Sequence, residues 1–150
     1  MTSSQQKDHS DTKIRVVLAL PYYEGHDKGL TLVSRWLRDA GMEVIYLGSF
    51  VNEQMIVSAA IAEDADAIGL SFTCSRLYTK IFPRVVELLR ERGADGILVI
   101  GGGHILDQDR SLLEKEGVIG NFGPGTPKAV IIDFITDRVK ENRLAKCKGS

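Results

Sequence analysis

The stretch "IRVVLALPYYEGHDKG", residues 14–29, begins as an apolar run and enters a loop that holds a histidine between carboxylates. The run at 14–20 is short and rich in β-branched and aliphatic side chains, which is typical of a strand buried on both faces. The segment that follows, "LTLVSRWLRDAG" at 30–41, repeats apolar residues with helical spacing and stops at Gly41. A buried strand that leads through one loop into an amphipathic helix is the repeating unit of a parallel α/β sheet.

The same alternation of apolar run and amphipathic segment occurs five times along the chain. Strands are predicted at residues 14–20, 43–47, 67–71, 97–100 and 118–122. Helices are predicted at 30–41, 52–64, 82–93, 107–117 and 126–142, with Asn52 and Thr126 as candidate N-caps. The sequence therefore predicts an α/β fold: a flavodoxin-like, doubly wound, five-stranded parallel sheet of order 2-1-3-4-5, in a single domain. We expect the domain at 14–141, a disordered lead-in at 1–13 and a flexible tail at 142–150.

Composition limits the possible partners and the compartment. The 150 residues carry a formal net charge of -1, so no global field attracts nucleic acid or an anionic membrane. No apolar run approaches the length of a bilayer span, and the N-terminus lacks the apolar region of a signal peptide. Cys74 and Cys147 lie far apart and in no zinc-binding spacing. The simplest interpretation is a reduced, cytoplasmic protein with no nucleic-acid or membrane partner.

The predicted architecture also indicates where a ligand binds. In an open parallel sheet, ligands bind outside the carboxyl ends of the strands, where the strand order reverses. The third predicted strand ends at Ser71, where a phosphoacceptor receiver domain needs an aspartate. The chain has no Walker A loop, no dinucleotide-binding G-x-G-x-x-G after the first strand, and no G-x-S-x-G elbow. These loops therefore do not support phosphotransfer, dinucleotide binding or serine hydrolysis.

His26, in the first loop, is the residue best suited to chemistry. A neutral imidazole binds cobalt, iron, zinc or copper, and a metal-bound histidine usually donates its second N–H to a carboxylate or carbonyl. Glu24, two residues earlier, is placed to accept that hydrogen bond, and Gly29 lets the loop close over a bulky ligand. The residues alone fit a second interpretation, in which His26 is a solvated loop histidine and Glu24 and Asp27 are ordinary turn acids.

These residues belong to a longer pattern. Residues 14–140 resemble the cobalamin (B12)-binding domain of adenosylcobalamin-dependent acyl-CoA mutases of the methylmalonyl-CoA mutase type. The D-x-H-x-x-G signature of that family reads "EGHDKG" at 24–29. Segments similar to the family follow in its order and spacing: "LRDAGMEVIYLG", "IAEDADAIGLS", "FPRVVELLRERGAD", "ILVIGGG" and "FGPGTP". This resemblance over nearly the whole predicted domain is more specific than the short motif.

The resemblance implies a cofactor and the residues that hold it. Cobalamin would bind base-off, its nucleotide tail would enter the sheet edge between the first and third strands, and His26 would become the lower axial cobalt ligand. Ser71 would lie along the tail, the glycine run at 101–103 would make room for it, and 123–126 would close the far end. The implied cofactor-binding residues are Tyr23, Glu24, Gly25, His26, Asp27, Gly29, Ser71, Phe72, Thr73, Gly101, Gly102, Gly103, His104, Gly123, Pro124, Gly125 and Thr126.

The chain departs from the family pattern in its first and third loops. The family aspartate is Glu24 here, and its extra methylene shifts the carboxylate by roughly one bond length, so we expect the contact with His26 to need loop adjustment or a water. The leucine of the family's S-x-L segment is Thr73, and "TCSRLYTKI" replaces a small, Gly/Ala-rich stretch. Arg76 and Tyr78 there would reach a corrin side chain or a partner subunit, or else be exposed loop residues.

The resemblance also implies an activity and a partner. The family pairs this domain with a (β/α)8 barrel that binds the acyl-CoA ester, and such a barrel needs about 250 residues. We therefore expect the small subunit of a two-subunit isomerase, inactive without its large subunit, that catalyses a radical carbon-skeleton rearrangement. A corrinoid carrier for methyl transfer and a non-catalytic cobalamin sensor stay open as alternatives. An aromatic and apolar rim is expected to face the cofactor and the partner: Tyr22, Tyr23, Phe50, Phe72, Leu77 and Tyr78.

Overall fold

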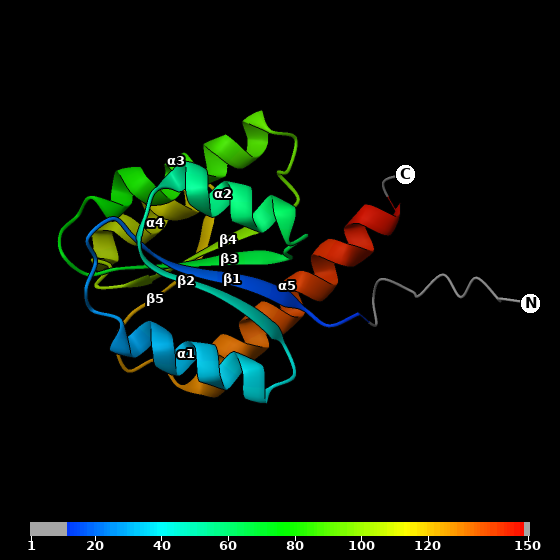
Figure 1. Ribbon diagram of the computed structural model, residues 1–150, viewed down its shortest axis with the longest axis horizontal. Coiled ribbons are helices and arrows are strands. Elements are labelled where there is room, and N and C mark those ends of the chain that lie inside the picture. Colours follow the sequence, from blue (N-terminus) through cyan, green and yellow to red (C-terminus); the bar gives the residue numbers. More distant parts are fainter. Residues whose placement is uncertain (1–11, 149–150) are drawn as a thin grey trace, which may run out of the picture.

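The computed structural model describes residues 12–148, in which parallel strands alternate with helices (Figure 1). The strands are β1 (Arg15–Pro21), β2 (Glu43–Val51), β3 (Ala67–Phe72), β4 (Leu98–Gly103) and β5 (Val118–Phe122). The helices are α1 (Lys28–Asp39), α2 (Glu53–Ala62), α3 (Tyr78–Glu91), α4 (Asp107–Lys115) and α5 (Lys128–Lys148). The strand order is β2-β1-β3-β4-β5 with parallel neighbours, so the predicted flavodoxin-like doubly wound sheet is confirmed. Among residues 12–148, no helix combines the length and the hydropathy of a membrane span.

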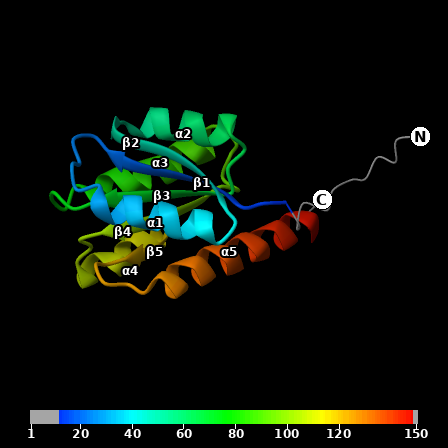
Figure 2. The same cartoon turned by 60° about the horizontal axis from the view of Figure 1, so that its bottom comes forward.

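Helices cover both faces of the sheet. α1 and α5 lie against one face, and α2, α3 and α4 lie against the other (Figures 1 and 2). Along β1, Val16 and Leu18 pack on the α1/α5 side, whereas Val17 and Ala19 pack on the opposite side. This alternation follows from the two-residue period of a strand, and burial on both faces explains why β1 is an apolar run.

Several predicted boundaries move because of contacts that are distant in sequence. β2 continues beyond the predicted end at 47, because it pairs with β1 as far as Pro21 and Val51 after a register shift near Gly48. α3 begins one turn before the predicted start at 82, where the buried side chains of Tyr78 and Ile81 anchor the extra turn. Both extensions lengthen elements toward the edge of the sheet where β1 and β3 end.

The chain does not fray at residue 142 as predicted, because α5 (Lys128–Lys148) continues through that position. The Nδ2 group of Asn142 donates to the carbonyl of Gly96 at 2.7 Å, and Nη2 of Arg143 lies 2.9 Å from Oδ2 of Asp66. These contacts fasten the end of α5 to the loops that precede β3 and β4. The predicted lead-in lies outside the described residues except for 12 and 13.

The predicted helix caps have different outcomes. The side chain of Asn52 accepts a hydrogen bond from the N–H of Met55 at 2.9 Å, so this N-cap is confirmed. Met55 itself is half-exposed, and the buried residues of α2 are Ile56, Val57 and Ala60. The hydroxyl of Thr126 donates to the carbonyl of Gly123 at 2.7 Å and so closes the turn before α5, rather than starting the helix as predicted.

Candidate functional site

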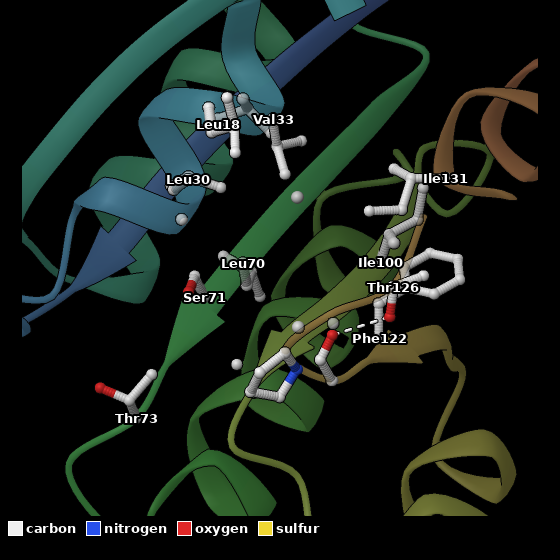
Figure 3. A pocket seen from close by; sticks show the side chains of 18 of the residues that line it. Leu18, Leu30, Val33, Leu70, Ser71, Thr73, Ile100, Phe122, Thr126 and Ile131 are labelled. Carbon is white, nitrogen blue, oxygen red and sulfur yellow. Dashed lines mark hydrogen bonds between the residues drawn. The ribbon is translucent and has the colours of Figure 1, made fainter. Parts of the chain in front are cut away.

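A cavity of about 370 Å³ lies on the α1/α5 side of the sheet, and strands β1, β3 and β4 form its floor (Figure 3). Leu30 and Val33 of α1 lie on one side of β3, and Ile131 of α5 lies on the other with Phe122. β1 leads to α1 on this face, whereas β3 leads to α3 on the opposite face. The loops after these neighbouring strands therefore diverge, which leaves a crevice at the predicted switch point.

Most of the residues predicted to bind the cofactor meet at this cavity. They are His26, Gly29, Ser71, Thr73, Gly101, Gly102, Gly103, His104, Gly123, Pro124, Gly125 and Thr126. Tyr23, Glu24 and Phe72 instead line a second cavity, of about 750 Å³, which is bordered by Leu77 and Lys80. Gly25 and Asp27 belong to the loop between the two cavities and line neither.

Sequence reasoning missed the apolar part of the lining. These residues are Val16, Leu18, Leu30, Leu32, Val33, Trp36, Gly69, Leu70, Ile100, Phe122, Ile131 and Ile135. On sequence grounds they are core residues, because strand and helix periodicity do not distinguish a packed core from the wall of a crevice. Gly69 was the available signal, because a glycine inside a strand often marks a close approach, and a Cβ there would lie 2.6 Å from Cδ2 of Leu18. The lining suits a long, partly apolar ligand.

The glycine run of β4 has two separate roles. A Cβ at Gly101 would lie 2.3 Å from Oδ1 of Asn121, and one at Gly103 would lie 2.3 Å from the carbonyl oxygen of Phe72. Gly103 also has a φ of +115°, which side chains rarely adopt. A Cβ at Gly102 would instead meet only two backbone oxygens, at 3.5 and 3.8 Å. The packing of the protein itself therefore requires glycine at 101 and 103. At Gly102, a side chain would fill space in the cavity without disturbing that packing.

Glu24 is fully buried, and hydrogen-bond donors surround its carboxylate. Oε1 accepts from the N–H of His26 at 2.9 Å, and Oε2 accepts from the N–H groups of Cys74, at 3.1 Å, and Thr73. The hydroxyl of Thr73 lies 3.0 Å from both oxygens. Burial raises the pKa of this carboxyl, but hydrogen bonds from Thr73 and His26 outweigh burial and lower the pKa to about 2. Glu24 is therefore an anion at neutral pH.

The imidazole of His26 is oriented directly by this carboxylate. Nδ1 of His26 lies 2.7 Å from Oε1 of Glu24, so the two groups are in direct contact and no water bridges them. The Glu24 side chain, longer than the family's aspartate, also reaches the loop after β3, where its carboxylate accepts from the N–H groups of Thr73 and Cys74. Since an ionised carboxylate can only accept, Nδ1 carries the proton, and the neutral ring keeps its lone pair on Nε2. The His26 side chain is 73% exposed, so Nε2 is available to a metal from outside.

Glu24, His26 and Cys74 bring an oxygen, a nitrogen and a sulfur within 4.8 Å of one another, a donor set that resembles a metal site. The Glu24 oxygens, however, already accept hydrogen bonds from the backbone. Burial, followed by the neighbouring Glu24 carboxylate, raises the pKa of the Cys74 thiol, and a protonated thiol is a poor ligand. This cluster is therefore built to hold the imidazole, and Nε2 remains its one open ligand atom.

Arg76 and Tyr78 turn toward α4 rather than toward a ligand. Nη2 and Nε of Arg76 lie 2.6 and 3.0 Å from the carboxylate oxygens of Asp109, and the hydroxyl of Tyr78 donates to the same carboxylate. Tyr78 is 1% exposed and Asp109 is 2% exposed, so the prediction that Tyr78 meets a corrin, a partner or solvent is wrong. The guanidinium of Arg76 lowers the pKa of Asp109, which stays charged. This ion pair fixes the far end of the loop that begins at Thr73.

The predicted aromatic rim is only partly at the surface. Phe72 and Tyr78 are buried in the protein's own core. Tyr23 is 83% exposed and Phe50 is 73% exposed, and their rings meet edge to face with centroids 6.0 Å apart. Solvent therefore reaches only some of the predicted members, namely Tyr22, Tyr23, Phe50 and Leu77.

Known proteins similar to this chain share one domain. The model of the B12 binding domain family matches residues 14–132. The "2-hydroxyisobutanoyl-CoA mutase small subunit" of Aquincola tertiaricarbonis is 43% identical over 128 residues, which are 85% of this chain and 93% of that protein. The "Pivalyl-CoA mutase small subunit" of Xanthobacter autotrophicus is 35% identical over 139 residues, which are 92% of this chain and 93% of that protein.

A solved structure agrees with these relatives. The crystal structure of a cobalamin-binding protein from Desulfitobacterium hafniense DCB-2 has a TM-score of 0.68 and 26% sequence identity. The similarity covers 84% of this chain and 58% of that one. The family model spans most of the residues that form the sheet, the cavity and the His26 loop. This chain therefore belongs to the B12-binding domain family.

Proposed function

We propose that this chain is the cobalamin-binding small subunit of a two-subunit acyl-CoA mutase, with adenosylcobalamin bound base-off and His26 as the lower cobalt ligand. The observation that carries the proposal is the pair of His26, which lines the cavity, and Glu24, which holds its ring. A buried carboxylate fixes the proton on Nδ1 and leaves Nε2 for a metal. The relatives from Aquincola tertiaricarbonis and Xanthobacter autotrophicus, both small subunits of acyl-CoA mutases, support the choice of reaction.

The described residues fit this cofactor. The crevice between α1 and α5 offers an apolar channel for a nucleotide tail, with Ser71 and Thr126 as polar groups along it. A Cβ at Gly25 or Gly29 would meet no protein atom within 4 Å, so the loop beside His26 has open space next to it. A corrin ring is a wide group, and open space beside its lower ligand is what it needs.

The chain's own residues would bind and orient the cofactor. When bound, adenosylcobalamin would supply the radical chemistry that the rearrangement of a CoA ester's carbon skeleton needs. Glu24 would keep the proton on Nδ1 of His26, and His26 would present Nε2 to cobalt. The apolar walls of the crevice would exclude water from the tail.

The substrate pocket would belong to a large (β/α)8-barrel subunit. The exposed rings of Tyr23 and Phe50 and the side chain of Leu77 lie beside the loop that holds His26. Exposed apolar groups of this kind are typical of a surface that a partner covers.

Reconstitution tests the proposal. The purified chain is mixed with a candidate large subunit and adenosylcobalamin, and turnover of linear and branched acyl-CoA esters is measured. We expect isomerisation that requires both subunits and the cofactor. Cobalamin-dependent methyl transfer with a methyltransferase partner, and no isomerisation with any acyl-CoA mutase large subunit, would contradict the proposal.

A further inference from the structure

We infer that Thr73 is the positioning residue for the cobalt ligand: its hydroxyl holds Glu24 and His26 together and keeps Nε2 of His26 free for the metal. The inference rests on the proposed function in taking His26 as the ligand. The hydrogen bonds that support it involve only residues of this chain.

Thr73 contacts both members of the pair. Its hydroxyl oxygen lies 3.0 Å from each carboxylate oxygen of Glu24 and 2.9 Å from Nδ1 of His26. Its N–H also donates to Oε2 of Glu24. Glu24 is fully buried, so each donor that it loses has no bulk water to replace it.

The hydroxyl of Thr73 can donate one hydrogen bond and accept others, so it can bind Glu24 and His26 at the same time. A threonine hydroxyl has one proton and two lone pairs, and a carboxylate has only lone pairs. With the proton on Nδ1, as the contact with Glu24 requires, the ring N–H donates to the hydroxyl oxygen, and the hydroxyl proton goes to Glu24. Nδ1–H is then shared between Oε1 of Glu24, at 2.7 Å, and the oxygen of Thr73, at 2.9 Å. The other tautomer would set a bare Nδ1 against the carboxylate oxygen, so Glu24 favours an unprotonated Nε2, and the Thr73 hydroxyl, bonded to both groups, holds them in that arrangement.

The length of Glu24 is matched to Thr73. The carboxylate spans two loops, because it binds His26 after β1 and the N–H groups of Thr73 and Cys74 after β3. An aspartate is shorter by one carbon–carbon bond, about 1.5 Å. From the same backbone it cannot keep both sets of contacts, so Glu24→Asp is expected to loosen the ring rather than improve its support.

The loop that carries Thr73 is fixed at its far end as well. Arg76 and Tyr78 bind the buried carboxylate of Asp109 at the start of α4. The segment from Thr73 to Tyr78 is thus fastened by one buried carboxylate at each end. The hydroxyl of Thr73 is therefore held in place before any cofactor arrives.

The test uses Thr73→Val, which keeps the branched shape and lacks the hydroxyl, and Thr73→Ser, which keeps the hydroxyl. Long-range ¹H–¹⁵N NMR of the cofactor-free chain reports which nitrogen of His26 carries the proton. We expect Nδ1–H in the wild type and in Thr73→Ser. In Thr73→Val, where neither Glu24 nor His26 is held by the hydroxyl, the exposed ring should leave Oε1 part of the time, and we expect a mixture of tautomers. Titration with cob(II)alamin, followed by quenching of Trp36 in the cavity wall, should give about 10- to 100-fold weaker binding for Thr73→Val.

The outcomes separate this inference from the proposed function. Thr73→Val with the wild-type tautomer and wild-type affinity would overturn the positioning role. If Thr73→Val does not fold, Thr73→Ala also lacks the hydroxyl and is read in the same way. A wild-type chain that shows Nδ1–H but binds no cobalamin would overturn the proposed function and support the hydrogen-bond arrangement.

Discussion

Replacing Gly102 with alanine should weaken cobalamin binding and leave the fold intact. Gly102 lines the cavity, and its new Cβ would meet Phe122 O at 3.5 Å and Leu70 O at 3.8 Å, which are ordinary contacts. The methyl group would instead occupy space that the nucleotide tail needs. Overfilling a close-packed site costs about 1–3 kcal/mol, which corresponds to roughly 5- to 150-fold weaker binding.

Gly101→Ala is the matched control. Gly101 is next to Gly102 on β4, and its Cβ would point toward the opposite face of the sheet. Its Cβ would lie 2.3 Å from Oδ1 of Asn121 and 3.1 Å from the ring of Phe82. This overpacking should lower the free energy of unfolding by about 1–3 kcal/mol and the melting temperature by about 2–12 °C.

Cobalamin affinity and thermal stability are measured for Gly102→Ala and Gly101→Ala. Trp36 is the one tryptophan of the chain and lines the cavity, so quenching of its fluorescence follows cobalamin binding. Circular dichroism follows thermal unfolding. If Gly102→Ala binds cobalamin as tightly as the wild type, the tail does not occupy this crevice and the reasoning is wrong.

The remaining predictions concern Glu24, His26 and the partner. The pKa of Glu24 falls from 4.5 to about 2 on folding, so its contribution to stability, at most about 3 kcal/mol, is present above pH 4.5 and is lost as pH falls toward 2. Denaturant titrations across this range should show a shallower pH dependence for Glu24→Gln, and an unchanged slope would count against the buried carboxylate. His26→Ala should fold like the wild type, because the side chain is 73% exposed, but should lose most mutase activity with the large subunit; full activity would rule out the ligand role. The isolated chain with adenosylcobalamin should show negligible acyl-CoA turnover, and measurable turnover would place a substrate site on this chain.

Patterns that are local in sequence predicted the fold. β-branched runs, helical spacing and an N-cap such as Asn52 act over a few residues, and they sufficed for the strand order and for the position of the crevice. His26, Gly29 and the glycines that end β4 and follow β5 could be placed near the cavity from that order, since carboxyl ends of parallel strands meet at one edge.

What the sequence did not predict depends on partners far along the chain. Thr73 lies 49 residues from Glu24, and no local pattern indicates that its hydroxyl and N–H bind that carboxylate. Asp109 lies 33 residues from Arg76, so the burial of Tyr78 beside them was hidden as well. Arg143 lies in the segment that was predicted to be a flexible tail, yet it pairs with Asp66, 77 residues away.

Electron paramagnetic resonance of cob(II)alamin bound to the ¹⁵N-labelled chain tests most directly whether His26 ligates cobalt. Nε2 of a labelled histidine should split each cobalt line into a doublet, and the doublets should vanish in His26→Ala. Triplets from the ¹⁴N base of the unlabelled cofactor would show that cobalt keeps its own base and would contradict the account.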